Sequence, residues 1–302
     1  KEWFETKRGT VLGLVSGLAG LGGTSIALVM PSIIGAGGWQ LGFRFLALYV
    51  TALTVLPGLF LIRSRPSDVG LTAYGAAPKP ADGLDVQVPG VPASRAFRSL
   101  SFALLALGLV AFNMVLGIHQ HLVPLTMERG VDLGGAGLIT SAVSLAIIGG
   151  SFLMGVLVDR WGSVATVWVA CTILSAGLGL LILARGLVPL LGSALAVGVG
   201  STMPMVLAAV LVMACFGPRD FRRILGPVMA TGPLGAAIGA PVWGLIKDQL
   251  GNYDAALAAF AILTLLAAGA IQVGVAAGRR LRAAVEPGQG FSISPAGAGA
   301  TR

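Results

Sequence analysis

Long apolar runs separated by short polar turns dominate the pattern of this 302-residue chain. The hydrocarbon core of a bilayer is about 30 Å thick, so a spanning helix needs about 20 predominantly apolar residues. Runs of that length recur throughout the chain, and glycine, proline or charged residues separate them. The pattern predicts an all-α polytopic membrane protein with about eight transmembrane helices, at residues 10–34, 41–62, 100–124, 133–158, 164–184, 187–216, 224–246 and 254–278.

The connections between these helices are short, with one exception. Residues 63–99 contain five prolines among small and polar residues. They are expected to form a flexible linker outside the bilayer, and a proline-rich recognition segment is the alternative. Residues 280–302 are rich in Gly, Ala and Ser and contain too little apolar material to fold, so a disordered tail is expected there.

Composition supports a membrane protein and excludes a soluble one. Hydrophobic residues make up 56% of the chain and charged residues 11%, with a mean hydropathy of +0.90. A soluble domain usually contains about a quarter charged residues. The only cysteines, Cys171 and Cys215, fall within apolar runs. They are expected to be buried free thiols, and neither a metal site nor a cofactor is expected.

The formal net charge of +8 follows from the predicted topology. Short cytoplasmic loops of membrane proteins carry an excess of Lys and Arg. Of the 20 Lys and Arg residues, sixteen fall on one side of the predicted helices and four on the other, namely Arg44, Arg129, Arg185 and Lys247. This count predicts a multi-pass protein of the plasma (inner) membrane with both chain ends, the linker and the turn at Asp159 in the cytoplasm. The basic surplus thus reflects topology; membrane lipid is an expected partner, and no nucleic-acid partner is expected.

The chain also contains an internal repeat. A shift of 213 residues aligns residues 12–13 with residues 225–226, and a shift of 214 aligns Trp39 with Tyr253. The first predicted helix therefore matches the seventh, and the second matches the eighth. A parallel repeat of this kind is typical of transporters built from two related halves.

The repeat predicts the organisation of the chain. Residues 1–62 would be the end of an N-terminal half, with two spans, and residues 63–99 the cytoplasmic linker. Residues 100–279 would be a complete C-terminal half of six helices, and residues 280–302 the cytoplasmic tail. Four further helices, roughly a hundred residues, are expected to precede Lys1.

The stretch Gly155-Val156-Leu157-Val158-Asp159-Arg160-Trp161-Gly162 places an acid–base pair between two apolar runs. It resembles the loop signature of the major facilitator superfamily, whose members are secondary transporters with twelve helices in two halves of six. Other motifs resemble the branch of monocarboxylate transporters and oxalate/formate antiporters: Trp3-Phe4 with Lys7-Arg8-Gly9, Gly38-Trp39, His121 to Leu125 with Arg129-Gly130, Phe216 to Gly226, and Asp248 with Gly251 and Tyr253. The resemblance implies that the chain corresponds to the last eight of the twelve helices.

The resemblance also implies a gate. In the superfamily the acid of this loop docks on the start of a helix in the opposite half, which by the repeat is the first predicted helix here. The residues expected to form this cytoplasmic latch are Gly155, Asp159, Arg160, Gly162, Lys7 and Arg8. The alternative is a solvated turn that only fixes the topology.

Small residues recur every four positions in two of the predicted helices. They are Gly9, Gly13 and Gly17 in the first, and Gly232, Ala236, Ala240 and Gly244 in the seventh. Such rows allow a neighbouring helix to approach closely. They are expected to serve helix packing, either as static contacts or as seams that slide while the two halves rock.

Polar residues within spans must pair or line a cavity, because isolated polar groups are costly in lipid. The candidates for a substrate cavity are Asn113, His119, Gln120, Ser144, Ser151, Thr202 and Met203. An imidazole such as His119 is able to exchange protons near neutral pH, and an interfacial hydrogen-bonded histidine is the alternative. Serine hydroxyls in helices commonly bond back to their own helix, which is the alternative for Ser144 and Ser151.

The expected function is secondary active transport of a small organic solute by alternating access. A monocarboxylate or similar organic anion, moved with a proton or by anion exchange, is one candidate. Carriers of small carboxylates in the resembling branch have an arginine where this chain has Ser151, so a neutral or amphipathic solute is equally compatible. An exporter of drugs or other hydrophobic compounds and an inactive fragment are the alternatives on this fold. An enzyme is not expected, because apart from two histidines the spans lack clustered His, Asp or Glu.

Overall fold

The computed structural model describes residues 8–60, 70 and 89–285 of the chain. Within these ranges the chain is helical, with turns and short irregular connections and no strand. The helices are α1 (Arg8–Phe60), α2 (Ala93–Phe97), α3 (Leu100–Val115), α4 (Ile118–Glu128), α5 (Leu133–Leu183), α6 (Leu187–Gly200), α7 (Met203–Phe216), α8 (Phe221–Leu250) and α9 (Asp254–Val285). The prediction of an all-α protein is confirmed.

Six helical segments in the described ranges are long and apolar enough to cross a membrane: Val29–Leu59, Leu100–Glu128, Leu133–Leu183, Leu187–Phe216, Phe221–Leu250 and Asp254–Val285. Their outward faces carry exposed Leu, Ile, Val and Phe side chains, as expected for helices whose surroundings are lipid. The chain is therefore a polytopic membrane protein.

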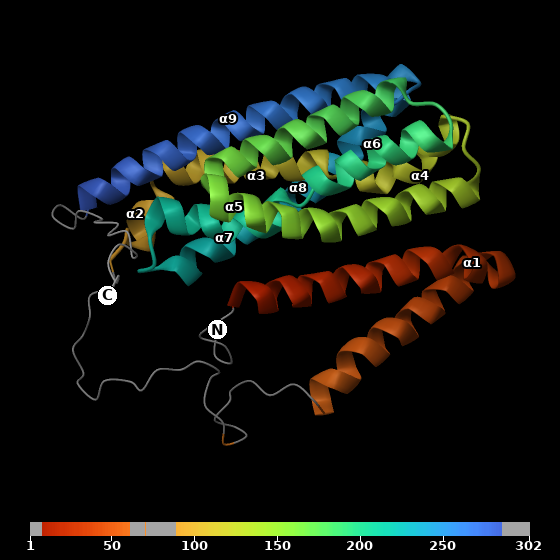
Figure 1. Ribbon diagram of the computed structural model, residues 1–302, viewed down its shortest axis with the longest axis horizontal. Helices are drawn as coiled ribbons and strands as arrows, with labels where there is room; N and C mark the ends of the chain where they lie inside the picture. The colour runs from red at the N-terminus through yellow and green to blue at the C-terminus, as the bar shows by residue number, and fades with distance from the viewer. Residues whose placement is uncertain (1–7, 61–69, 71–88, 286–302) are drawn as a thin grey trace, which may run out of the picture.

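Two of the helices double back on themselves (Figure 1). In α1 the helical geometry fails at Gly37 and Gly38, and Gly38 has a φ of 74°. In α5 it fails at Gly162, which has a φ of 80°. A positive φ is strained for every residue with a Cβ, so glycine permits both reversals. They fall within the predicted turns at residues 35–40 and 159–163.

Two of the predicted single spans each consist of two consecutive helices, and the residues at both joints keep right-handed helical φ and ψ angles. The span predicted at 100–124 consists of α3 and α4, which meet at Leu116 and Gly117. The span predicted at 187–216 consists of α6 and α7, which meet at Ser201 and Thr202. Gly117 has no room for a side chain, because a Cβ there would lie 2.8 Å from the Trp243 ring.

Helices α3, α8 and α9 pack together, and α5 packs against α6, α9 and α1. The α3–α8 crossing is the tightest of these contacts. A Cβ on Gly235 would lie 2.5 Å from the Cβ of Asn113, and one on Gly239 would lie 2.2 Å from the Met114 carbonyl oxygen. Backbones that approach this closely gain van der Waals contact where the lipid offers no hydrophobic driving force.

The start of the short helix α2 is hydrogen-bonded to the turn between α7 and α8. The backbone N–H of Ala93 donates to the Asp220 carboxylate at 2.8 Å, and that of Val91 donates to the Phe216 carbonyl at 2.8 Å. Residues 63–69 and 71–88 of the predicted linker lie outside the described residues. Helix α9 continues to Val285, so residues 280–285 of the predicted tail are helical, and residues 286–302 lie outside the described part.

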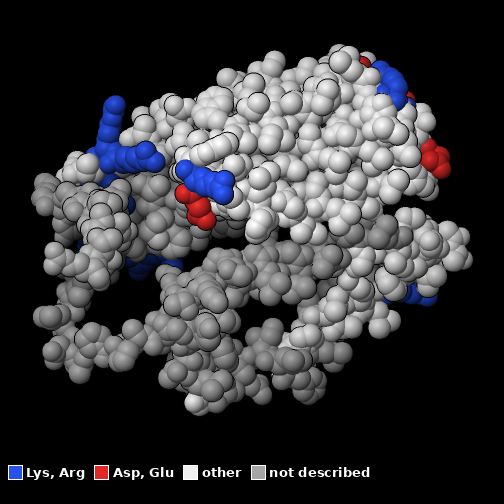
Figure 2. Space-filling model, in the orientation of Figure 1, with Lys and Arg blue, Asp and Glu red and all other residues white. Residues whose placement is uncertain are grey.

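Arginine side chains gather at the end of the bundle that contains α2 and the C-terminal end of α9 (Figures 1 and 2). Nine described arginines belong to the side that the sequence assigns to the cytoplasm. They lie in or beside α2, at the α5 reversal, around the α7–α8 turn and near the end of α9: Arg95, Arg98, Arg160, Arg219, Arg222, Arg223, Arg279, Arg280 and Arg282. The opposite end contains the α4–α5, α5–α6 and α8–α9 turns.

Candidate functional site

A cavity of about 290 Å³ lies where α3, α7 and α8 meet, and we refer to it as the Asn113 pocket. It is lined by Leu109, Asn113, Leu116, Ser201, Pro204, Met205, Ala208, Val228, Met229, Thr231, Gly232 and Pro233. Among these residues none is charged. Leu116 and Ser201 belong to the α3–α4 and α6–α7 joints, so both joints adjoin this pocket.

The hydrogen-bonding groups of the Asn113 pocket are mostly acceptors. The hydroxyls of Ser201 and Thr231 donate their single protons to the carbonyls of Val197 and Val228, both at 2.6 Å. The Asn113 side-chain amide donates one of its two N–H groups to the Leu109 carbonyl at 2.8 Å. The lining thus keeps one amide N–H as a donor and the side-chain oxygens of Asn113, Ser201 and Thr231 as acceptors, of which Ser201 Oγ also contacts His119, and this balance favours a solute that donates hydrogen bonds.

A proline leaves one helix carbonyl at this pocket without its usual N–H partner. Pro233 has no N–H to donate to the carbonyl of Met229, four residues earlier, and both residues line the pocket. The same relation recurs in α8 between Pro241 and Ala237, which both line a second cavity. The sequence places three prolines in this helix, and the structure shows that two of them, Pro233 and Pro241, line pockets.

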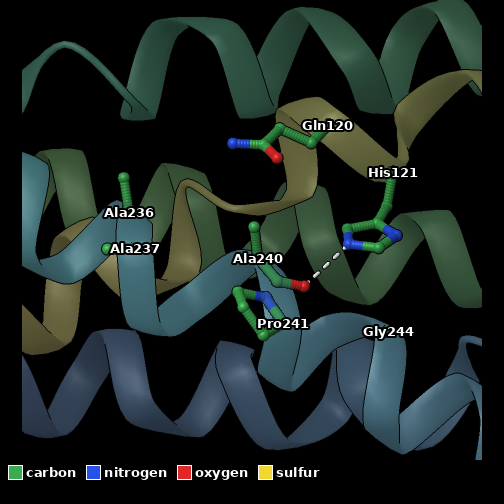
Figure 3. A pocket seen from close by; sticks show the side chains of 7 residues that line it. All are labelled: Gln120, His121, Ala236, Ala237, Ala240, Pro241 and Gly244. Atoms are coloured by element: carbon green, nitrogen blue, oxygen red, sulfur yellow. Dashed lines mark hydrogen bonds between the residues drawn. The ribbon is translucent and has the colours of Figure 1, made fainter.

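The second cavity has a volume of about 610 Å³ and lies between α4 and α8; we refer to it as the His121 pocket. Its lining consists of Gln120, His121, Ala236, Ala237, Ala240, Pro241 and Gly244. Figure 3 shows the small residues of α8 forming one wall and the His121 ring directed at the Ala240 carbonyl. One wall of the pocket thus consists of small residues, and the imidazole of His121 and the exposed amide of Gln120 lie across from it.

The two histidines of the chain lie on α4 and contact different helices. His119 Nε2 lies 3.2 Å from Ser201 Oγ, which has already donated its proton to Val197. His119 must therefore donate, which fixes its proton on Nε2. His121 Nε2 lies 2.9 Å from the Ala240 carbonyl, and its Nδ1 lies 3.2 Å from the Tyr253 hydroxyl.

The aromatic rings of Trp243 and Tyr253 lie beside the His121 ring. Its ring stacks on Trp243, with centroids 6.4 Å apart, and lies 5.8 Å from the ring of Tyr253. Trp243 is fully buried and stacks in turn on Phe260, at 4.4 Å. Lys247 lies 5.1 Å above the Tyr253 ring. The cluster therefore joins α4, α8 and the start of α9.

Burial raises the pKa of the Tyr253 phenol, and the carboxylates of Glu128 and Asp248 raise it further. Tyr253 lies in the turn between α8 and α9. Its hydroxyl therefore keeps its proton at physiological pH and is able to donate it to His121.

The other predicted cavity residues lie away from the two pockets. Ser144 and Ser151 donate their hydroxyls to the carbonyls of Thr140 and Ile147 in their own helix, at 3.2 and 2.8 Å. Thr202 and Met203 are buried beside the α6–α7 joint, and their neighbours Ser201, Pro204 and Met205 line the Asn113 pocket instead. Of the seven cavity candidates, Asn113 and Gln120 line a pocket, and His119 contacts a lining residue. The substrate role of all seven stays a prediction.

The small residues of α8 form two parallel rows with different surroundings. Gly232 lies beside the Asn113 pocket, and Ala236, Ala240 and Gly244 line the His121 pocket. The neighbouring row, Gly235 and Gly239, makes the close contact with α3. The packing role predicted for the first row stays a prediction, as does that of Gly9, Gly13 and Gly17, which lie in a part of α1 whose side chains are not described.

The loop signature lies at the reversal of α5. Asp159, Arg160 and Gly162 are exposed, Gly155 is half-buried, and a Cβ on Gly155 or Gly162 would meet no atom within 4 Å. Helix α1 packs against α5, and Figure 1 shows its N-terminal end on the same side of the molecule as this reversal. Lys7 and the side chain of Arg8 lie outside the described residues, so the latch stays a prediction.

A buried arginine organises the opposite end of the bundle, and the sequence did not single it out for this role. The side chain of Arg129 is 6% exposed, forms a salt bridge with Asp254 and donates to the Ile182 carbonyl at 2.7 Å. Its own carbonyl accepts from the N–H of Gly186 at 3.3 Å. Arg129 therefore connects the ends of α4 and α5 with the start of α9. Its place in a short charged turn gave no sign of burial.

The structure thus combines long apolar helices with an uncharged pocket between α3, α7 and α8. The model of the Major Facilitator Superfamily matches residues 122–295, more than half of the chain. The chain belongs to this superfamily, which consists of membrane transporters and not of enzymes. The resemblance read from the loop signature is thereby confirmed.

Curated relatives of the chain are transporters too. It is 26% identical over 270 residues to Monocarboxylate transporter 11 of Homo sapiens, covering 84% of this chain and 53% of the relative. It is 26% identical over 283 residues to the MFS-type transporter hasB of Aspergillus fumigatus, covering 89% and 60%. It is 34% identical over 110 residues to the Hexuronate transporter of Bacillus subtilis, covering 36% and 26%. The chain thus spans between about half and 60% of the length of the first two.

Proposed function

We propose that the protein is a secondary active transporter that moves a small organic solute through the Asn113 pocket by alternating access. The observation that carries this proposal is an uncharged cavity between α3, α7 and α8 that is lined by two prolines of spanning segments, Pro204 and Pro233. Prolines within spanning helices free backbone groups, and in transporters such positions often lie at the binding site.

The proposed topology has eight spans, matching the last eight of twelve. Helix α5 contains 51 residues, which corresponds to about 77 Å of helix. That is more than twice the thickness of the hydrocarbon core, so α5 and likewise α1 count as two spans each, divided at their glycines. The arginine-rich end, which would also carry the linker and both chain ends, faces the cytoplasm of the plasma (inner) membrane in this proposal.

A small organic acid is the first candidate solute. Monocarboxylate transporter 11 and the Hexuronate transporter, by their names, move acids of this kind. No charged residue is among the described lining of the Asn113 pocket, and its oxygens outnumber its free N–H groups. A carboxylate only accepts hydrogen bonds. The pocket therefore suits the protonated acid or a hydroxyl-bearing solute better than the bare anion.

A hydrophobic compound is the second candidate. Apart from Asn113, Ser201 and Thr231, the pocket is lined by apolar residues and glycine. Ligand sites with many apolar groups and few polar ones accept amphipathic molecules readily. This lining fits export of lipophilic compounds on the same fold.

The cytoplasmic latch is part of the same proposal. Asp159 would dock on the N-terminal end of α1, near Lys7 and Arg8, when the cytoplasmic side is closed. The free backbone N–H groups and positive dipole at a helix N-terminus attract a carboxylate. The packing of α1 against α5 supports a contact at this end.

The test is uptake by the intact protein in proteoliposomes with lactate, glucuronate and tetraphenylphosphonium as probes. Asn113→Leu keeps the approximate volume of the side chain and removes its amide. It is expected to lower uptake of the transported probe at least about tenfold, since an amide that orients a bound solute contributes about 1.5 kcal/mol or more. Ser144→Ala, which changes a hydroxyl bonded to its own helix, is the control and is expected to transport normally. Equal uptake by the two variants would contradict the assignment of the pocket.

A further inference from the structure

Trp168 of α5 and Gln272 of α9 form a hydrogen-bonded pair outside both pockets. The indole N–H of Trp168 donates to the side-chain oxygen of Gln272 at 2.7 Å, and both side chains are exposed. An indole N–H only donates, so the bond fixes the orientation of the amide, with its oxygen toward the indole and its NH₂ group away from it. This NH₂ group has no acceptor among the described residues.

The pair lies on a face of the bundle that contacts lipid. Figure 1 shows α9 on the side of the bundle opposite α1. Apolar side chains of the same two helices are exposed, among them Leu180, Leu266 and Val273. An NH₂ group without an acceptor is costly against hydrocarbon. The missing acceptor therefore has to come from the membrane itself.

The pair lies near the arginine-rich end of the bundle. Arg279 follows Gln272 by seven residues, which is about two turns or 10 Å of helix, so the two residues share one face of α9. The interfacial layer on each side of the hydrocarbon core is roughly 5–8 Å thick. With Arg279 among the headgroups, Gln272 therefore lies where that layer meets the hydrocarbon. Trp168 follows the reversal at Gly162 by about 9 Å of helix, and tryptophan is enriched at this depth.

Positive charge lies beside the pair at the headgroup level. Arg279 and Arg280 are exposed, and neither forms a salt bridge or a side-chain hydrogen bond with another described residue. The salt bridges between described residues lie at the opposite end of the bundle. Ala276, which lies between Gln272 and Arg279, is exposed and presents only a methyl group. Figure 2 shows basic side chains gathered at this end of α9.

This order of groups along α9 matches the order of groups along an anionic phospholipid. A guanidinium binds phosphate through charge-assisted, paired hydrogen bonds. The ester carbonyls below the phosphate only accept hydrogen bonds, which suits the NH₂ group of Gln272. The acyl chains then lie against the exposed apolar side chains of α5 and α9.

We propose that α5 and α9 form a binding site for one anionic phospholipid. Arg279 holds the phosphate, and Gln272, oriented by Trp168, donates to an ester carbonyl. The site differs from general lipid contact, because one amide and one arginine define it. It does not depend on the proposed transport function. Because the lipid contacts both helices, its binding stabilises the folded chain.

The first test is native mass spectrometry of the purified chain in detergent, with phosphatidylglycerol as the probe. An ether-linked phosphatidylglycerol, which lacks ester carbonyls, is the matched ligand control. The wild type is expected to bind the ester lipid about two- to tenfold more tightly than the ether lipid, the value of one net hydrogen bond. Gln272→Leu is expected to lose this preference. Arg279→Gln is expected to bind both lipids about tenfold more weakly, because a hydrogen bond to a charged group contributes more.

Arg222→Gln is the control variant, since Arg222 is an exposed arginine of α8 near the same end of the bundle. It removes the same charge and is expected to bind both lipids as the wild type does. An equal loss in Arg222→Gln and Arg279→Gln, or a wild type that does not prefer the ester lipid, overturns the proposal. Displacement of the lipid by equimolar glycerol 3-phosphate would assign the site to a free phosphate instead. A dimer without bound lipid would assign the surface to a second copy of the chain.

The second test is the unfolding temperature of the same variants, measured by circular dichroism, which also shows that each variant folds. Phosphatidylglycerol is expected to raise the midpoint of the wild type and of Arg222→Gln more than phosphatidylcholine does, because phosphatidylcholine has no net charge. Arg279→Gln is expected to lose that difference. A difference that persists in Arg279→Gln at the wild-type size overturns the role of this arginine.

Discussion

The α3–α8 crossing gives the sharpest prediction of stability. In Gly239→Ala the new Cβ would lie 2.2 Å from the Met114 carbonyl oxygen and 2.6 Å from its Cα. Both are backbone atoms, so no side-chain rotation relieves the clash, and the helices must separate by about 1 Å to restore contact distances. The same shift strains the hydrogen bond from the buried Trp243 indole to that carbonyl, now 3.3 Å.

The expected cost follows from two opposing effects. Overpacking of a close contact costs about 1–3 kcal/mol. Replacing glycine by alanine inside a helix returns up to about 1 kcal/mol. Subtracting the second effect from the first leaves a net destabilisation by Gly239→Ala of about 0–2 kcal/mol, and the contact with backbone atoms favours the upper end. Gly226→Ala in the same helix gains the second effect alone, because a Cβ there meets no atom within 4 Å.

The assay is the temperature at which half of the purified, detergent-solubilised chain unfolds, measured by circular dichroism. Gly239→Ala is expected to unfold at a lower temperature than the wild type, and Gly226→Ala at the same or a slightly higher temperature. Equal midpoints for the two variants would refute the claim that α3 and α8 touch through Gly239.

Two further predictions concern the ends of the bundle. Asp254→Asn removes the carboxylate that neutralises the buried Arg129, and it is expected to destabilise the chain by about 1–3 kcal/mol. Asp248→Asn, at an exposed position, is the control in the same unfolding assay. An equal effect of the two substitutions would contradict the importance of the salt bridge. Asp159→Asn is expected to impair uptake by the intact protein. It is also expected to speed the labelling of cysteines placed at the cytoplasmic side by thiol reagents, because the state that is open to the cytoplasm gains population. Unchanged uptake and unchanged labelling would contradict the latch.

Much of the helical architecture was predictable because a membrane imposes long apolar runs. The reversals at Gly38 and Gly162 were predictable as well, since glycine and charge mark them. The helix joints at Leu116–Gly117 and Ser201–Thr202 were not, because the backbone angles stay helical through both. They depend on tertiary contacts, such as that of Gly117 with Trp243.

The site was predictable only in part. Asn113 stood out as an amide within a span, and it does line a pocket. The rows through Gly232 and Gly235 have the same four-residue spacing, so the sequence does not reveal which of them faces α3. The two histidines differ by two residues, and only their partners Ser201 and Tyr253 distinguish them. Which face of a helix packs on its neighbour depends on the rotation of the helix about its axis. In a membrane, faces that contact lipid and faces that contact protein are both apolar, so the sequence does not reveal this rotation.

The central proposal is that solute passes through the Asn113 pocket, which requires that the pocket opens to water, and cysteine labelling in the membrane tests it most directly. The native Cys171 and Cys215 are buried. Met229→Cys places a thiol in the pocket, and Leu266→Cys places one on the exposed apolar face of α9. The account predicts that a charged, water-soluble thiol reagent modifies Met229→Cys, that a transported solute slows this reaction, and that Leu266→Cys stays unmodified. Equal modification of the two cysteines, or modification of Leu266→Cys alone, would contradict it.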